Sequence, residues 1–205
     1  MGGREELLEA VRSGDDTRVR SLLEADPSLA AVRDDDGISA VLNAHYRMRP
    51  DTVDILLAAG PELDVFEAAA LGRIDRVAEL LDGDPGLVAA WSPDGFTPLH
   101  LAAFFGHREA ADLLLERGSG VGLLARNPMA VTPLHGAAAG SRHAVAGLLL
   151  EHDAEGGRSP ARRLDAASLR FGQRRRAHGR AAPFPRRRPW CERRRGQAPA
   201  RPGDG

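Results

Sequence analysis

Thr97-Pro98-Leu99-His100 and Thr132-Pro133-Leu134-His135 are the same four residues, repeated 35 positions apart in the chain. Small apolar residues, a glycine and a run of leucines follow each copy. Threonine is a good helix N-cap, and proline is tolerated at the first helical position because its missing N–H would have no partner there. The tetrapeptide therefore predicts the start of a helix, and its recurrence predicts an internal repeat.

The repeat continues in weaker form towards the N-terminus. Alanines at equivalent positions stand 34, 24, 34 and 35 residues apart, and each is followed by a turn residue and a second apolar run. These alanines are Ala10, Ala44, Ala68, Ala102 and Ala137. We therefore expect an array over residues 4–156, made of about five units of two short helices. The expected units are residues 4–35, 36–64, 65–93, 94–128 and 129–156.

The segment Asp94–Ala103, which reads DGFTPLHLAA, resembles an ankyrin repeat, and residues 131–152 resemble one nearly as closely. The resemblance implies an all-α solenoid of helix-turn-helix units, in which finger loops link successive units and His100 bridges backbone groups of neighbouring units. The step of 24 residues leaves no room for a finger between Gly60 and Ala68. The resemblance also implies a non-catalytic protein–protein interaction module that binds through finger loops and concave helix faces.

Two further features make the chain similar to soluble bacterial ankyrin proteins. An Asp-Pro-x-Leu insertion follows the first and the third helix pair, at Asp26–Leu29 and Asp84–Leu87. The second feature is the alternation of these long connections with the short one between Gly60 and Ala68. Separately, all 28 basic residues are arginine, which points to a GC-rich genome.

Charge divides the chain near residue 156. Residues 1–156 hold 13 Arg and 26 Asp plus Glu, a net charge of −13, whereas residues 157–205 hold 15 Arg and 3 acids, a net charge of +12. The acidic array favours a basic protein partner. In residues 157–205, arginine triplets stand among prolines and glycines without a helical period, which predicts a disordered basic tail.

The tail has two explanations. Alanine codons read out of frame give Pro, Arg or Gly, and we favour a frameshifted or mispredicted C-terminus on that ground. The alternative is nucleic-acid association, in which clustered arginines neutralise phosphates while Phe184 and Trp190 stack on bases. No capping helix follows Leu148 and Leu149, so we expect the end of the array to be open to self-association.

Candidate partner-binding residues lie where an ankyrin array points outward. Asp34 and Asp35 stand at the expected tip of one finger, and Trp91 and Asp94 stand in another. Phe104 and Phe105 follow the alanines of an inner helix. An exposed ring there would anchor a partner, whereas a buried ring would fill a gap between units. We favour the second role for the phenylalanines, and Trp91 has the same two interpretations.

No catalytic, metal or cofactor site is expected. The seven histidines show no His-Glu-x-x-His spacing, and the glycines at 118, 120 and 122 lack the Lys of a phosphate loop. The acidic run 34–36 could hold a hard cation, but such a run is more often a solvated turn. The two tetrapeptides are expected to be structural.

No segment has the length and apolar character of a membrane span, and the N-terminus has no signal-peptide pattern. One cysteine, Cys191, cannot form an internal disulfide. We therefore expect a cytoplasmic protein that is not an enzyme, has no cofactor and binds no membrane.

Overall fold

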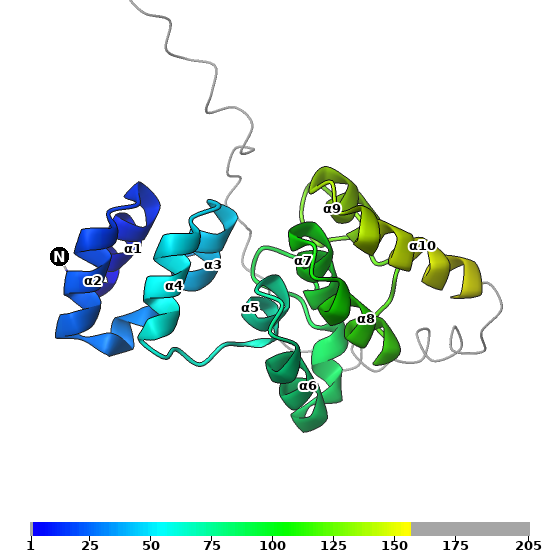
Figure 1. Cartoon of the computed structure of the whole chain (residues 1–205), viewed down its shortest axis with the longest axis horizontal. Coiled ribbons are helices and arrows are strands. Elements are labelled where there is room, and N and C mark those ends of the chain that lie inside the picture. Colours follow the sequence, from blue (N-terminus) through cyan, green and yellow to red (C-terminus); the bar gives the residue numbers. More distant parts are fainter. Residues whose placement is uncertain (1, 157–205) are drawn as a thin grey trace, which may run out of the picture. The chain divides into compact units, whose positions relative to one another are not determined.

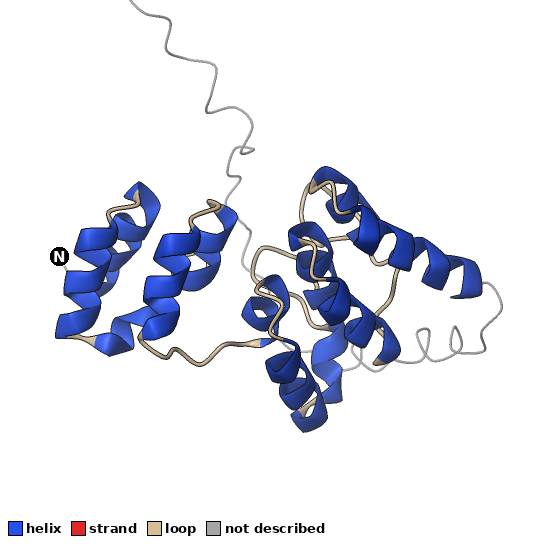
Figure 2. Cartoon of the chain, in the orientation of Figure 1, coloured by secondary structure: helices blue, strands red, loops and turns tan. Residues whose placement is uncertain are grey.

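A computed structural model of the chain describes residues 2–156, and Met1 and residues 157–205 lie outside the described part. Residues 2–156 form ten α-helices and two short 3-10 helices, with no β-strand among them (Figures 1 and 2). The expected all-α class is thus confirmed. The expected disorder of the tail and its nucleic-acid alternative concern residues that the structure does not describe.

The helices alternate between an inner and an outer position along the array (Figure 1). The inner helices are α1 (Gly3–Ser13), α3 (Ala40–Tyr46), α5 (Val65–Ala70), α7 (Pro98–Phe105) and α9 (Pro133–Ala139). The outer helices are α2 (Asp16–Ala25), α4 (Pro50–Ala58), α6 (Ile74–Gly83), α8 (Arg108–Glu116) and α10 (His143–Gly156). The Asp-Pro-x-Leu insertions form the 3-10 helices η1 (Pro27–Ala31) and η2 (Pro85–Ala89). One helix pair corresponds to each of the five expected units, although α1 begins at Gly3, one residue before the first of them.

Three of the inner helices, α5, α7 and α9, begin at reciprocal side-chain caps. The Thr97 hydroxyl accepts from the His100 backbone N–H, and the Thr97 N–H donates to His100 Nδ1 at 3.3 Å. The second tetrapeptide, Thr132 to His135, forms the same pair of contacts. The third unit lacks the tetrapeptide, but Asp64 and Glu67 form a capping box that does the same work. Two different sequences thus satisfy the free N–H groups at three helix starts.

Small residues let successive units approach closely. The equivalent alanines Ala44, Ala68, Ala102 and Ala137 are all 0% exposed. Each inner helix packs on the next, and outer helices pack as α2 on α4, α6 on α8 and α8 on α10. The exception is the pair α4 and α6, which make at most marginal contact. The apolar core accordingly has one cluster in the first two units and another in the last three, and a third cluster crosses the junction between them. The buried residues of this third cluster are Ile38, Leu42, Ala70, Leu101 and Phe105.

The connection between the second and third units has no finger, as the short step in the sequence predicts. Residues 60–64 have no regular structure and run directly from α4 to α5. Because this finger is missing, the finger before α3 meets the finger before α7: a Cβ atom added to Gly37 would lie 3.1 Å from Pro93. The Arg33 guanidinium, from the first of these fingers, bonds to Asp64 at 3.0 Å. Contacts of the finger before α3, with Pro93 of the finger before α7 and with Asp64 at the start of α5, therefore replace those of the missing finger.

The end of the array differs in detail from the expectation. Leu148 and Leu149 are buried at 5% and 1% exposure, because both point towards the preceding helices. Leu150 is the exposed leucine, at 55%. The open apolar surface is thus centred on Leu150 and not, as expected, around Leu148.

Candidate functional site

The finger at residues 32–39 uses one aspartate to hold its shape and exposes the next one at the surface. Asp34 Oδ1 accepts from the Ile38 N–H at 2.9 Å, and Oδ2 accepts from Asn43 Nδ2 at 3.0 Å. The Asp34 side chain is only 10% exposed and lies 3.5 Å from Arg12. The Asp35 side chain is 97% exposed, and its ion pair with Arg4 at 3.0 Å lies at the surface. Of the two candidates, Asp34 is committed to the loop and Asp35 is available to a partner.

The next finger, residues 90–97, repeats this geometry with a serine in place of Asp34. The Ser92 hydroxyl accepts from the Phe96 N–H at 2.9 Å. Asp94 contacts the Ser92 hydroxyl and accepts from the Tyr46 hydroxyl at 2.7 Å. Burial, and secondarily the Asp94 charge, raises the pKa of Tyr46 well above its usual range, so Tyr46 stays a donor to Asp94. Asp94 is thus half-buried and shared between the finger and α3.

Trp91 lies in the same finger and is covered from the following one. The Arg126 guanidinium carbon lies 4.3 Å from the centre of the indole ring, a cation–π contact. The indole also lies 6.3 Å, between ring centres, from His100. Trp91 therefore remains half-buried between two fingers, which supports the packing interpretation for this residue.

The two phenylalanines of α7 separate into different environments. Phe105 is 8% exposed, and its ring lies 3.9 Å from that of His45 and 5.9 Å from that of Tyr46. As a candidate partner anchor Phe105 is therefore wrong, because the missing finger brings α3 over α7 and buries the ring. Phe104 is 39% exposed and meets Phe105 edge-on at 5.1 Å. Phe104 keeps an accessible face on the inner side of the array.

The tetrapeptide histidines are structural. His100 is 3% exposed, and its Nε2 donates to the Val131 carbonyl of the next finger at 3.0 Å. Burial lowers the pKa of His100, which favours the neutral ring that this network needs. His135 repeats the contact with its threonine, Oγ1 to Nδ1 at 2.7 Å, but its ring is exposed. The expected bridging role of His100 is confirmed.

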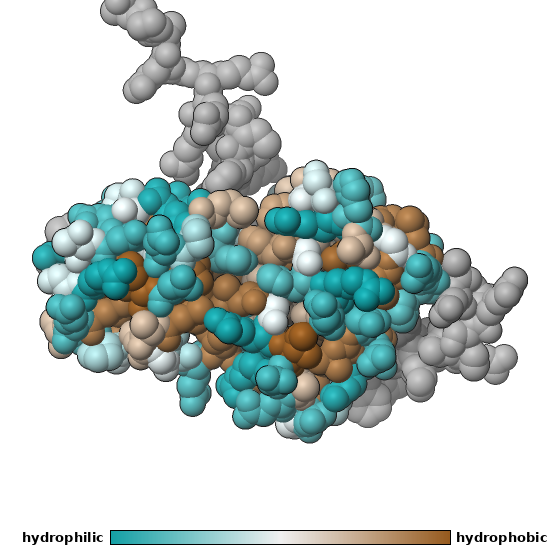
Figure 3. Space-filling model, in the orientation of Figure 1, coloured by the Kyte–Doolittle hydropathy of each residue, from teal (hydrophilic) through white to brown (hydrophobic). Residues whose placement is uncertain are grey.

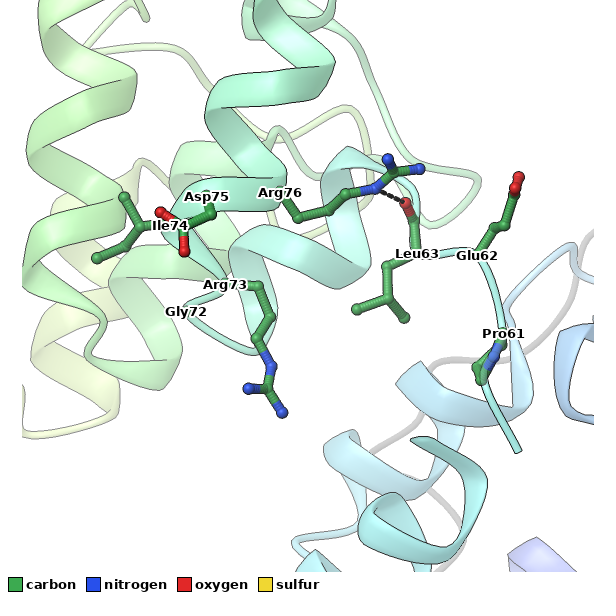
Figure 4. Close-up of a pocket in the computed structure, with 8 residues that line it drawn as sticks. All are labelled: Pro61, Glu62, Leu63, Gly72, Arg73, Ile74, Asp75 and Arg76. Atoms are coloured by element: carbon green, nitrogen blue, oxygen red, sulfur yellow. Dashed lines mark hydrogen bonds between the residues drawn. The ribbon is translucent and has the colours of Figure 1, made fainter. Parts of the chain in front are cut away.

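The fingerless junction contains a groove that the sequence interpretation missed. It has a volume of about 630 Å³ and lies between residues 61–63 and the start of α6. Figure 4 shows the Leu63 and Arg73 side chains beside this space, whereas Ile74 lies on the far side of the turn from residues 61–63. Arg76 Nε donates to the Leu63 carbonyl at 3.1 Å and fixes one wall. The short step at Gly60 was the only sequence signal for this groove.

Other exposed apolar side chains were also missed. Met48 is 66% exposed at the turn between α3 and α4, and Met129 is 62% exposed in the finger before α9. Figure 3 shows brown, apolar areas broken by teal, hydrophilic ones on one face of the molecule. Because these methionines lie in loops, they belong to no periodic sequence pattern from which their exposure could be predicted. Together with Asp35, Asp36 and Phe104, Met129 defines a candidate protein-binding surface, which we call the finger surface.

Within residues 2–156, no cluster of three or more His, Cys, Asp or Glu side chains could hold a metal ion. The acidic run 34–36 accordingly forms a turn in the described structure. None of the described helices has the length and apolar character needed to cross a membrane.

Comparison with known proteins agrees with the helix pairs. A family model for ankyrin repeats, in three copies, matches residues 7–118 and 65–159. The probable E3 ubiquitin-protein ligase XBOS31 of Oryza sativa subsp. japonica is 42% identical over 66 residues, covering 32% of this chain and 15% of that protein. The ankyrin repeat and SAM domain-containing protein 6 of Mus musculus is 35% identical over 83 residues, covering 37% of this chain and 9% of that protein.

A third relative is the E3 ubiquitin-protein ligase XB3 of Oryza sativa subsp. japonica, which is 43% identical over 61 residues, covering 29% of this chain and 14% of that protein. The chain therefore spans at most 15% of the length of these three curated relatives. They come from a plant and a mouse, and the resemblance to bacterial proteins stays a prediction.

Proposed function

This chain belongs to the ankyrin repeat family, and we propose from that premise that it is a non-catalytic module that binds another protein through its finger surface. The contrast between Asp34 and Asp35 carries the proposal. Asp34 fixes the loop through hydrogen bonds to Ile38 and Asn43, while the neighbouring Asp35 side chain is 97% exposed. A partner would meet a preformed loop and would bind with little loss of conformational entropy.

Phe104 supplies the apolar part of the proposed surface. Its ring is held edge-on against the buried Phe105 and is still 39% exposed. Rigid aromatic rings surrounded by polar groups are frequent anchors of protein interfaces. Met129, 62% exposed at a finger tip, adds a second and more adaptable apolar contact.

We further propose that the partner presents a basic surface. Residues 1–156 carry a net charge of −13. Asp35 and Asp36 are both exposed at the finger tip, where a cationic side chain can reach them. Complementary charge of this kind speeds association and weakens as salt is added. We also propose that the chain itself is cytoplasmic.

The test uses the full chain as bait in an extract of its source cells. The Asp35→Lys/Asp36→Lys variant should lose captured partner by about ten-fold, and Phe104→Ala should lose a similar amount. The matched control is Glu24→Lys/Asp54→Lys, which makes the same change of charge at exposed positions of the outer helices α2 and α4. Equal loss in both double variants would show that overall charge, and not the finger surface, holds the partner.

A further inference from the structure

The two ends of the described array are chemically different. We call the outward side of α9 and α10 the C-terminal face; it consists of His135, Ala138, Ala139, Ala146, Gly147 and Leu150. Leu150 is 55% exposed, and His135, Ala138 and Ala139 are exposed as well. A Cβ atom added to Gly147 would meet nothing within 4 Å. Figure 3 shows brown, apolar surface over α10.

The fourth unit shows what becomes of such a face when another unit covers it. Leu115, the counterpart of Leu150, is 8% exposed, and Ala103, the counterpart of Ala138, is 0% exposed. The covering helix is α9, whose Gly136 lies so close that an added Cβ atom would be 3.6 Å from Phe104 Cβ. The C-terminal face therefore has the composition of a buried surface, although no helix within residues 2–156 covers it.

The N-terminal end of a second array cannot supply that cover. Glu9 and Ser13 on α1 occupy the positions of Gly136 and Gly140 on α9, and both are exposed. In such a stack Glu9 would lie against His135 and Ala139, the counterparts of the residues that Gly136 meets, and removing its carboxylate from water is unfavourable. Head-to-tail growth into a filament is disfavoured for the same reason.

A following finger is also disfavoured at the C-terminal face. Gly95 allows the next finger to pack on it, since an added Cβ atom would lie 2.7 Å from the Arg126 backbone. Ala130 occupies the equivalent position of the last finger and already carries a Cβ atom, at φ 45°. The partner of the C-terminal face must therefore present helices without a stacked finger, and an apolar surface.

We propose that the C-terminal face is a homodimer interface, in which two copies of the chain pair face to face about a two-fold axis. The face itself meets both conditions, because it is apolar and made of helices. A two-fold pair is closed, which agrees with the charged opposite end. Residues 1–156 carry a net charge of −13, so two copies repel one another at long range, and the pairing should strengthen as salt is added.

The dimer is weak and reversible. A helix rises about 1.5 Å per residue, so the short α9 and the longer α10 offer much less than the roughly 800 Å² per partner of a standard stable interface. None of the finger-surface residues belongs to the C-terminal face. A dimer would therefore present two finger surfaces at once, and a partner with two sites would bind it with higher avidity.

The test is sedimentation equilibrium of the full chain from about 1 µM to about 1 mM, a range suited to a weak interface. The expected result is a reversible change from monomer to dimer with no larger species. Leu150→Arg should leave only monomer, and Ala138→Arg should do the same if Leu150→Arg fails to fold. The matched control is Met48→Arg, which puts the same charge on a side chain that is 66% exposed at the α3–α4 turn and should keep the dimer.

Three results would overturn the proposal. A monomer at every concentration would assign the C-terminal face to another occupant, such as an ankyrin unit of another protein or residues 157–205 of this chain. A dimer that survives both arginine variants would place the interface elsewhere. Mass that keeps growing with concentration would show open association and not a two-fold pair. The proposed binding of a partner by the finger surface is tested independently, because the capture experiment changes other residues than the sedimentation experiment does.

Discussion

The fourth and fifth units carry the same tetrapeptide but differ in what surrounds it. The distance from threonine Oγ1 to histidine Nδ1 is 2.7 Å in both units. His100, however, is 3% exposed and bonded to the Val131 carbonyl of the next finger, whereas His135 is exposed. The motif sets the local geometry of the helix start, and the following unit decides how much that geometry stabilises the fold.

The largest expected difference between these units is in the tetrapeptide leucine. Leu99 is 0% exposed, and Leu134 is only half-buried. Leu99→Ala should lower the free energy of unfolding by about 3 kcal/mol, because it leaves a cavity in the core, and Leu134→Ala by about 1 kcal/mol. Denaturant unfolding of both variants measures the difference. Equal losses would mean that the fifth unit is packed as tightly as the fourth.

The finger turns give a second difference, of opposite sign in the two units. Gly95 has φ 83° and Ala130 has φ 45°, a region that favours glycine. Gly95→Ala should destabilise by about 2 kcal/mol, because its Cβ atom would also collide with the Arg126 backbone, 2.7 Å away. Ala130→Gly should stabilise by up to about 1 kcal/mol. Melting temperatures that shift in the same direction would contradict this contrast.

The histidines should differ by a smaller amount. His100→Ala removes a buried ring and leaves the Val131 carbonyl without its donor, at a cost of about 1–2 kcal/mol. His135→Ala removes only the contact with Thr132 and should cost less than about 1 kcal/mol. Unfolding curves of the two variants under one condition test this order, and a larger loss for His135→Ala would refute it.

Acid should have the smallest effect per side chain, and it should act on the middle of the array. Burial lowers the pKa of His45 and of His107, and both rings donate from Nε2 to the Ala70 carbonyl, at 2.9 and 2.8 Å. Because the folded protein favours the neutral rings, the unfolded chain takes up protons first as pH falls below the ordinary value of 6.5. Stability should therefore be fully present above pH 6.5 and decline below it.

The variant His107→Gln separates titration from packing. Glutamine keeps a donor near Ala70 but cannot be protonated, so its unfolding free energy should change less between pH 7.5 and 5.5 than that of the unchanged chain. Arg142 and Glu109 also act on His107, in opposite directions, and both are unchanged in this variant. An identical pH dependence in the two proteins would assign the acid sensitivity to other groups.

The sequence predicted those features that depend on neighbouring residues. The tetrapeptides and the alanine register encode a cap, a first helical turn and a close approach, and all of these act over a few residues. The capping box of Asp64 and Glu67 has the same short-range character, although it was not predicted. The helix pairs of the array could therefore be predicted without coordinates.

The sequence could not predict how adjacent, similar residues divide between interior and surface. Asp34 is held by Asn43 and Arg12 while Asp35 is not, and Phe105 is buried by Tyr46 and His45 while Phe104 is not. The burial of Phe105 depends on residues far away in the chain and on the missing finger. Such contacts have no local signature, so the candidate surface could be defined only from the structure.

The direct link at residues 60–64 also makes the series of loop tips irregular. Tips emerge after the first, third and fourth helix pairs, and none emerges after the second. A ligand with features at a constant interval could match neighbouring tips on one side of the omitted finger. Its spacing would not match that of the tips on the other side. The spacing of the loop tips therefore does not match that of a ligand with a strict translational repeat, such as another regular solenoid.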